Sequence, residues 1–172
     1  AINCGGVGFL TEMEQDADLF SAIKKVEKGQ YELQKLQRID TYINDLLIGT
    51  ALNEVVLHSS RVAKIQGFEI QINKLLVDSF RGDGLIIATP TGSTSYAMSL
   101  GAPILYPTME SHIIVPIAAY RLGARPLIIP SKYTIHAKLT GNPEAVMVID
   151  GQDEIMVTIE DSIILKQSGN PV

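Results

Sequence analysis

The hydrophobic pattern of this chain changes from helical to strand-like near residue 30. Before that point, apolar residues from Leu19 to Val26 recur at helical spacing, and a glycine follows them. Thr11 and Glu14 precede them with the spacing of a capping box. These features predict a helix over about 13–28.

From Tyr31 onward the chain consists of short apolar runs separated by turn residues. Phe68 and Ile72 belong to a run that alternates apolar and polar residues, as a half-buried antiparallel strand does. Asp150 and Gly151 lie between two apolar runs and predict a hairpin. Strands are expected in the runs 31–39, 51–59, 67–72, 84–89, 112–118, 125–130, 133–139, 145–150, 154–159 and 162–167.

A second, short helix is predicted from Thr94 to about Gly101, with Ser93 or Thr94 as its N-cap. Many short strands with one leading helix and one short helix indicate a mainly β fold. We therefore expect an antiparallel β-sandwich-like domain.

Composition narrows the classes of function. The 172 residues carry a net charge of −5, which disfavours binding to nucleic acid or to an anionic membrane. No apolar run is long enough to span a membrane, and Cys4 is the sole cysteine, which suits a reducing cytoplasm. The chain enters a glycine-rich turn almost at its first residue, so we expect it to be a fragment of a longer protein.

The segment 89–96, TPTGSTSY, is a polar interruption between apolar runs. A strand end that leads through a glycine turn into a helix start exposes backbone N–H groups and hydroxyls, which suit a phosphate, a ribose or a base edge. The residues alone are equally compatible with a serine- and threonine-rich loop that merely caps a helix.

Asn53 and Glu54 lie inside an apolar run, where a buried carboxylate and amide need partners. The alternative is an edge strand with Glu54 facing water. Because neighbouring strand residues face opposite sides, both can reach one ligand only at a bulge or a strand end. A shared ligand therefore predicts such an irregularity at Asn53 and Glu54.

Two further turns carry candidate residues. Arg81 and Asp83 flank Gly82, with Gly84 following, shortly before segment 89–96. This short distance along the chain favours a shared site, although turn chemistry alone explains the pattern. Asp150 and Gln152 lie at the predicted hairpin, where the turn itself is the favoured explanation.

Other kinds of site are disfavoured. The chain has no phosphate-binding loop of the G-x-x-x-x-G-K-[ST] type. The three histidines lie far apart without metal-ligand spacing, and we expect each to be an ordinary strand residue.

Five segments carry a recognisable pattern, in this order: NCGGVGFLTE, ALNEVVLH, FRGDGLIIATPTGSTSYAMSLGAPIL, RPLIIP and VIDGQ. In order and spacing they resemble the NAD kinases over nearly the whole chain, most specifically at 78–104. The resemblance implies phosphorylation of the 2′-hydroxyl of the adenosine ribose of NAD, giving NADP. It implies ATP or another phosphoryl donor with Mg²⁺ or another divalent cation, and assembly into a homo-oligomer. It also implies a two-domain protein with a C-terminal β-sandwich.

The resemblance implies ligand-binding roles for particular residues. Asn53 and Glu54 match the pair that binds the adenosine half of the dinucleotide, and Tyr96 matches a position against the adenine. Ala118 and Tyr120 fall in a region that lines the nicotinamide side. The remaining positions that match ligand contacts are Lys64, Arg81, Asp83, Thr91, Thr94, Ser95, Ser99, Asp150 and Gln152.

The chain departs from the family pattern in one important respect. The Gly-Gly-Asp-Gly motif, which carries the family's proposed general base, is absent from 1–172, so we expect no catalytic residue in this chain and no catalysis by it alone. Ser95 stands where the family usually has Ala, which adds a hydroxyl that could tune affinity.

The resemblance also suggests boundaries: 1–12 as the end of a preceding α/β domain, 13–29 as a connecting helix, 30–160 as the NAD-binding sandwich, and 161–172 as a terminal strand and tail. Two alternatives remain: a lipid kinase related to diacylglycerol or sphingosine kinase, and a non-catalytic dinucleotide-binding β-domain.

Overall fold

The computed structural model describes residues 13 and 18–172 and divides into two units, Ala1–Gln34 and Lys35–Val172. The described part of the first unit holds one helix, α1 (Leu19–Glu27). Asp18 is its N-cap, and the Asp18 carboxylate accepts a hydrogen bond from the N–H of Ser21. The helix is thus shorter than the expected 13–28, and the capping box at Thr11 and Glu14 lies outside the described residues.

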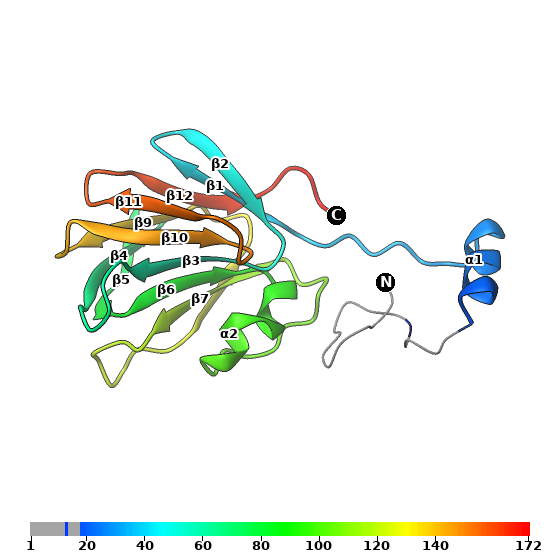
Figure 1. Ribbon diagram of the computed structural model, residues 1–172, viewed down its shortest axis with the longest axis horizontal. Helices are drawn as coiled ribbons and strands as arrows, with labels where there is room; N and C mark the ends of the chain where they lie inside the picture. Colours follow the sequence, from blue (N-terminus) through cyan, green and yellow to red (C-terminus); the bar gives the residue numbers. More distant parts are fainter. Residues whose placement is uncertain (1–12, 14–17) are drawn as a thin grey trace. The chain divides into compact units, whose positions relative to one another are not determined.

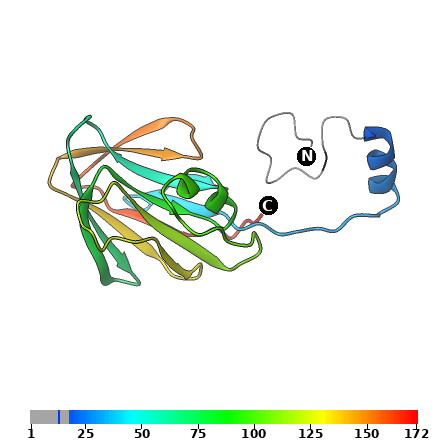
Figure 2. The ribbon, with the colours of Figure 1, turned by 90° about the horizontal axis from the view of Figure 1, so that it is seen from below.

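The second unit is built from two six-stranded antiparallel sheets (Figures 1 and 2). The first sheet has the order β2-β1-β12-β9-β4-β5, and the second has the order β11-β10-β3-β6-β7-β8. The mainly β fold expected from the sequence is confirmed. The strands are β1 (Ile39–Ile43), β2 (Leu46–Ala51), β3 (Glu54–Ser59), β4 (Gln66–Ile72), β5 (Leu75–Gly82), β6 (Gly84–Ala88), β7 (Ser111–Ile117), β8 (Leu127–Pro130), β9 (Ile135–Thr140), β10 (Glu144–Ile149), β11 (Glu154–Thr158) and β12 (Ile163–Gln167).

Side chains from both sheets form one hydrophobic core between the layers. Phe68 of β4 and Leu57 of β3 are completely buried there, and Phe68 stacks obliquely on Phe80 with ring centroids 5.4 Å apart. The alternation read from β4 is confirmed, since its apolar residues point into this core.

Strand β6 is buried on both faces, which explains why its sequence GLIIA is apolar throughout. Leu85 and Ile87 point into the core between the sheets. Ile86 and Ala88 point the other way, into a smaller cluster with Ala97 of helix α2 (Tyr96–Ser99). Figure 2 shows this helix against the sheet that contains β6 and β7. The polar segment 89–96 is therefore held at the end of the most deeply buried strand.

Three tight turns join neighbouring strands through consecutive residues with positive φ. Asp150 and Gly151 (φ 48° and 66°) join β10 to β11, which confirms the predicted hairpin. The turns at 44–45 and 73–74 were not anticipated, although their asparagines tolerate this conformation. Strands β2 and β5, which follow these two turns, were likewise not predicted from the sequence.

Two local predictions were wrong. The run 31–39 has no regular structure before β1 begins at Ile39. The expected second helix is split into a short 3₁₀ helix, η1 (Thr91–Thr94), and α2, and neither has a side-chain cap. The split arises because Ser95 adopts a non-helical conformation between the two pieces.

The end of the chain is part of the first sheet. Strand β12 lies between β1 and β9, and Val172 exchanges two backbone hydrogen bonds with Leu36. Residues beyond 160 therefore belong to the same compact unit as the sandwich. The assignment of 1–12 to a preceding domain stays a prediction.

Candidate functional site

The chain is irregular where Asn53 and Glu54 lie, as a shared ligand requires. Strand β3 begins only at Glu54, and residues 52–53 form a bend before it. The first pair of the β3–β6 ladder joins Glu54 to Ala88, immediately before segment 89–96. The expected irregularity is thus present, and the start of β3 and the end of β6 lie side by side at one end of the sheet.

Asp150 holds this irregular backbone in place from the β10–β11 turn. Its Oδ1 accepts hydrogen bonds from the N–H groups of Asn53 (2.8 Å) and Glu54 (2.9 Å), and its Oδ2 accepts one from Leu52 (2.6 Å). The N–H of Asp150 in turn donates to the carbonyl of Glu54 (3.0 Å). Because a carboxylate is an acceptor-only group, it suits three converging N–H donors. Asp150 therefore does more than form a turn.

Segment 89–96 packs its backbone against the same bend. The N–H of Thr89 donates to the carbonyl of Asn53 (2.8 Å), and a Cβ added at Gly92 would lie 2.1 Å from that oxygen. Only glycine therefore fits at position 92. The hydroxyl of Ser93 donates to Pro90 (2.6 Å) and accepts from the N–H of Leu105 (3.0 Å), so Ser93 is a tether and not a helix cap.

Glu54 is the buried carboxylate at this end of the sheet, with 7% of its surface exposed. Its Oε1 accepts a hydrogen bond from the Ser95 hydroxyl (3.0 Å), while its Oε2 is buried with no partner among the described residues. Burial, and after it the charge of Asp150, raises the pKa of Glu54; the Ser95 hydroxyl and the N–H of Tyr96 oppose that rise in pKa. The hydroxyl oxygen of Thr91 is likewise buried and unpartnered within the described chain.

A buried acceptor without a donor is costly, and Glu54 and Thr91 place two such atoms on neighbouring elements. Both would be satisfied by a ligand that offers hydroxyl or N–H donors. We call Asn53, Glu54, Thr91, Ser95 and Asp150 the Glu54 cluster.

Other residues predicted for this site lie beside the Glu54 cluster with fewer contacts. Tyr96 is 40% exposed, so its ring is accessible to a ligand. The Thr94 hydroxyl donates to the carbonyl of Thr91 (3.1 Å). Ser99 is exposed at the end of α2, and Gln152 is exposed in the turn after Asp150. Their ligand-binding roles stay predictions.

The remaining predicted residues lie toward the other end of β6, on β5 and on loops that join the strands. The N–H of Asp83 donates to Ile117 (2.9 Å), next to Ala118, and the N–H of Tyr120 donates to the carbonyl of Arg81 (2.7 Å). Ala118 has a φ of 45°, which is rare for a residue with a side chain. Lys64 lies in the loop between β3 and β4. We call Lys64, Arg81, Asp83, Ala118 and Tyr120 the Asp83 cluster.

The two clusters are separated by the length of β6. Gly84 pairs with His58 at one end of the ladder, and Ala88 pairs with Glu54 at the other. Four residue steps along a strand span about 13 Å. The short sequence distance between Asp83 and segment 89–96 is therefore not a short distance in space, because a strand carries its two ends apart, and a site shared by the two clusters stays a prediction.

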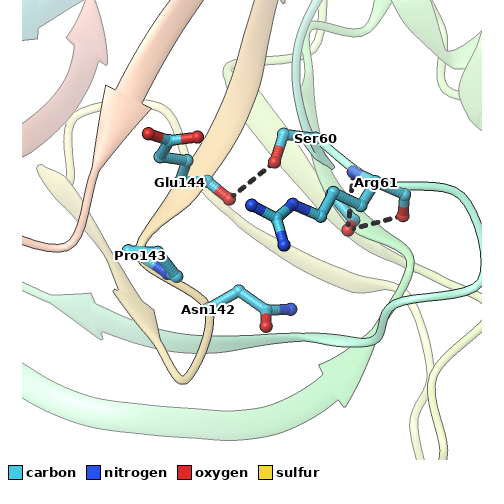
Figure 3. A pocket seen from close by; sticks show the side chains of 6 residues that line it. Ser60, Arg61, Asn142, Pro143 and Glu144 are labelled. Atoms are coloured by element: carbon cyan, nitrogen blue, oxygen red, sulfur yellow. Dashed lines mark hydrogen bonds between the residues drawn. The ribbon is translucent and has the colours of Figure 1, made fainter.

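A small hollow lies at the same end as the Asp83 cluster and is lined by Ser59, Ser60, Arg61, Asn142, Pro143 and Glu144 (Figure 3). The Ser60 hydroxyl donates to the carbonyl of Glu144 (3.3 Å), and the Asn142 amide donates to Ile65 (2.9 Å). These polar groups are already partnered. None of its lining residues has a buried polar atom without a partner, so the hollow is a weaker candidate than the Glu54 cluster, where two such acceptors lie.

Sequence reasoning missed two residues that shape the site. Thr89 accepts a hydrogen bond from the N–H of Gly92 (3.0 Å) and donates one to the carbonyl of Leu52 (2.5 Å). Gly92 itself allows the close approach to Asn53. The sequence did contain a signal for both residues, because a threonine directly after a buried strand is followed there by a proline and then by a glycine.

Comparison with known proteins identifies the class to which this fold and site belong. The model of the ATP-NAD kinase C-terminal domain matches residues 52–172. A solved structure of an NAD kinase from Archaeoglobus fulgidus, in complex with ATP, superposes with a TM-score of 0.84 at 33% identity, covering 99% of this chain and 65% of that one. A yeast NADH kinase complexed with NADH has the same fold, with a TM-score of 0.85 at 24% identity over 98% of this chain and 50% of that one.

Curated relatives agree with these structures. The NAD kinase of Methanothermobacter thermautotrophicus is 45% identical over 97% of this chain and 59% of its own length. The NAD kinase of Methanosarcina acetivorans is 42% identical over 99% of this chain and 62% of its own length. The chain belongs to the NAD kinase family, as its sequence motifs indicated, and the lipid-kinase alternative receives no support. The chain spans about three-fifths of the length of these relatives.

No helix among the described residues is both long and apolar enough to cross a membrane.

Proposed function

We propose that the protein to which this chain belongs phosphorylates the 2′-hydroxyl of the adenosine ribose of NAD, giving NADP, in the cytoplasm. In this proposal the chain supplies the NAD-binding face of the enzyme. The observation that carries it is the Glu54 cluster, whose two buried acceptors lack donors. The family membership of the chain supplies the choice of ligand.

The ribose and adenine of a dinucleotide match the chemistry of the Glu54 cluster. Ribose hydroxyls are the donors that Oε2 of Glu54 and the hydroxyl oxygen of Thr91 lack. The amide of Asn53 can pair with the adenine edge, and the exposed ring of Tyr96 can stack on the base. These residues bind and orient the substrate, while the group that activates the reacting hydroxyl lies outside the matched motifs of this chain.

ATP is the proposed phosphoryl donor, and polyphosphate is the alternative donor. Within residues 13 and 18–172, no group of three or more His, Cys, Asp or Glu side chains could hold a metal ion. The described residues thus offer no group of three or more such ligands that would hold Mg²⁺ by the protein alone. We propose Mg²⁺ as the companion of the ATP phosphates, where it neutralises charge during phosphoryl transfer.

In this proposal the Asp83 cluster contributes to the site of a second copy of the chain. Its position about 13 Å from the Glu54 cluster is too far for both to make close contact with the same half of one NAD molecule. Tyr120 of the cluster is 82% exposed, and apolar side chains close to the cluster in sequence are exposed as well, with Leu122 97% and Val62 98% exposed. We propose that a homo-oligomer buries this end against the Glu54 cluster of a neighbouring copy, so that each site contains residues from two chains.

The test is an assay of NADP formation by the full-length protein with NAD, ATP and Mg²⁺, together with calorimetric titration of NAD. Glu54→Gln should abolish NADP formation and weaken NAD binding, whereas Glu160→Gln, at an exposed turn, is the matched control. A wild-type protein that forms no NADP would refute the proposed kinase activity. NAD binding without NADP formation would favour the alternative, a non-catalytic dinucleotide-binding domain. This 172-residue chain alone is expected to form no NADP.

A further inference from the structure

The hydroxyl of Ser95 occupies the place of a helix cap without acting as one. Ser95 is the N-cap residue of α2, and a serine there usually accepts a hydrogen bond from the first turn. In this structure it forms no cap hydrogen bond. Its hydroxyl instead donates to Oε1 of Glu54 at 3.0 Å.

This contact fixes a carboxylate in one orientation. A carboxylate is planar, so a hydrogen bond that holds Oε1 also restricts the direction in which Oε2 points. The backbone beneath Glu54 is already held by Asp150, which accepts the N–H of Glu54 at 2.9 Å. Ser95 and Asp150 thus restrain the side chain and the main chain of the same residue.

We propose that Ser95 is a positioning residue that orients Glu54, so that a single free acceptor, Oε2, faces a hydroxyl donor of the bound ligand. The proposal rests on the proposed function in one respect, namely that the hydroxyl belongs to a ribose of NAD. Oε2 of Glu54 is buried without a partner in the described chain, which is the state that such a role requires.

The charges around Glu54 make the contribution of Ser95 measurable. Burial raises the pKa of Glu54, and Asp150 of the β10–β11 turn raises it further by charge repulsion. From α2, the Ser95 hydroxyl and the N–H of Tyr96 lower the pKa. Facing Glu54 on β6 is Ala88, an uncharged residue. Removing the Ser95 hydroxyl should therefore let Glu54 take up a proton at higher pH.

The experiment compares Ser95→Ala with wild type in the full-length protein. The carboxyl carbon of Glu54, assigned with Glu54→Gln, is followed by NMR through a pH titration. Its midpoint should move to higher pH in Ser95→Ala and return toward the wild-type midpoint in Ser95→Thr, which keeps a hydroxyl. Ser162→Ala, at an exposed position directly before β12, is the matched control and should leave the midpoint unchanged.

Calorimetric titration of NAD gives a second readout. At pH 7.5 we expect Ser95→Ala to bind NAD about fivefold more weakly, and the deficit should grow as the pH falls because protonated Glu54 offers a poorer acceptor. Because Oε1 of Glu54 loses the Ser95 donor in this variant, the urea midpoint of unfolding should also fall.

The outcomes separate the two proposals. An unchanged Glu54 midpoint in Ser95→Ala would overturn the positioning role, whether or not the protein binds NAD. A shifted midpoint with unchanged NAD affinity across pH would also overturn it, since orientation would then not matter to the ligand. Wild-type protein that binds no NAD would refute the proposed function, while the midpoint would still report the effect of Ser95 on Glu54.

Discussion

His112 should make the stability of this protein sensitive to mild acid. It lies on β7 with no exposed surface, paired across the ladder with Ile129. Strand alternation puts it on the same face as Ile114, which belongs to the core between the sheets. Neither ring nitrogen has a hydrogen-bond partner among the described residues, and burial lowers the pKa of His112 to about 4.

The sign and size of the effect follow from proton linkage. Above pH 6.5 the ring is neutral in both folded and unfolded chains, so His112 adds no pH dependence. Between pH 6.5 and about 4 only the unfolded chain binds the proton, and stability falls by about 1.4 kcal/mol for each pH unit. The loss from His112 between pH 7.5 and pH 5 is therefore about 2 kcal/mol.

His112→Leu removes the titration together with two unpartnered buried nitrogens. The variant should be at least as stable as wild type at pH 7.5 and should lose about 2 kcal/mol less on acidification to pH 5. Urea unfolding followed by far-ultraviolet circular dichroism at both pH values measures this difference. His58→Gln is the control, because His58 is exposed on β3. Equal losses in wild type and His112→Leu would refute the reasoning.

Three further predictions concern the site. Gly92→Ala should weaken NAD binding more than tenfold in calorimetric titration, because its Cβ would lie 2.1 Å from the Asn53 carbonyl oxygen; wild-type affinity would show that the loop can shift without harm. Asp150→Ala should lower the free energy of urea unfolding by about 2 kcal/mol, since three backbone N–H groups lose their acceptor. A change below about 0.5 kcal/mol would show that Asp150 does not stabilise the bend at 52–53. Co-expressed Glu54→Gln and Asp83→Ala chains should regain part of the NADP formation that each lacks alone, because mixed oligomers contain some unaltered sites; no recovery in confirmed mixed oligomers would exclude a site made by two chains.

The local chemistry of the site could be read from the sequence because it depends on neighbouring residues. Asn53 and Glu54 inside an apolar run required an irregularity, and β3 begins there. The Asp-Gly pair required a hairpin, and β10 and β11 form it. Positive-φ turns at 44–45 and 73–74 escaped notice because their residue pairs, Asn-Asp and Asn-Lys, are weaker turn signals than Asp-Gly.

What the sequence determined by itself was the family, the mainly β class and the residue types able to hold a nucleotide, since these depend on motifs and on alternation along the chain. The tertiary structure alone decided that Asp150 clamps a bend nearly a hundred residues away, and that Ser95 bonds to Glu54 and not to its own helix. It also decided that Asp83 and segment 89–96 lie at opposite ends of β6. Sequence spacing does not give spatial distance, because an extended strand separates residues that are close along the chain while strand pairing joins residues that are far apart.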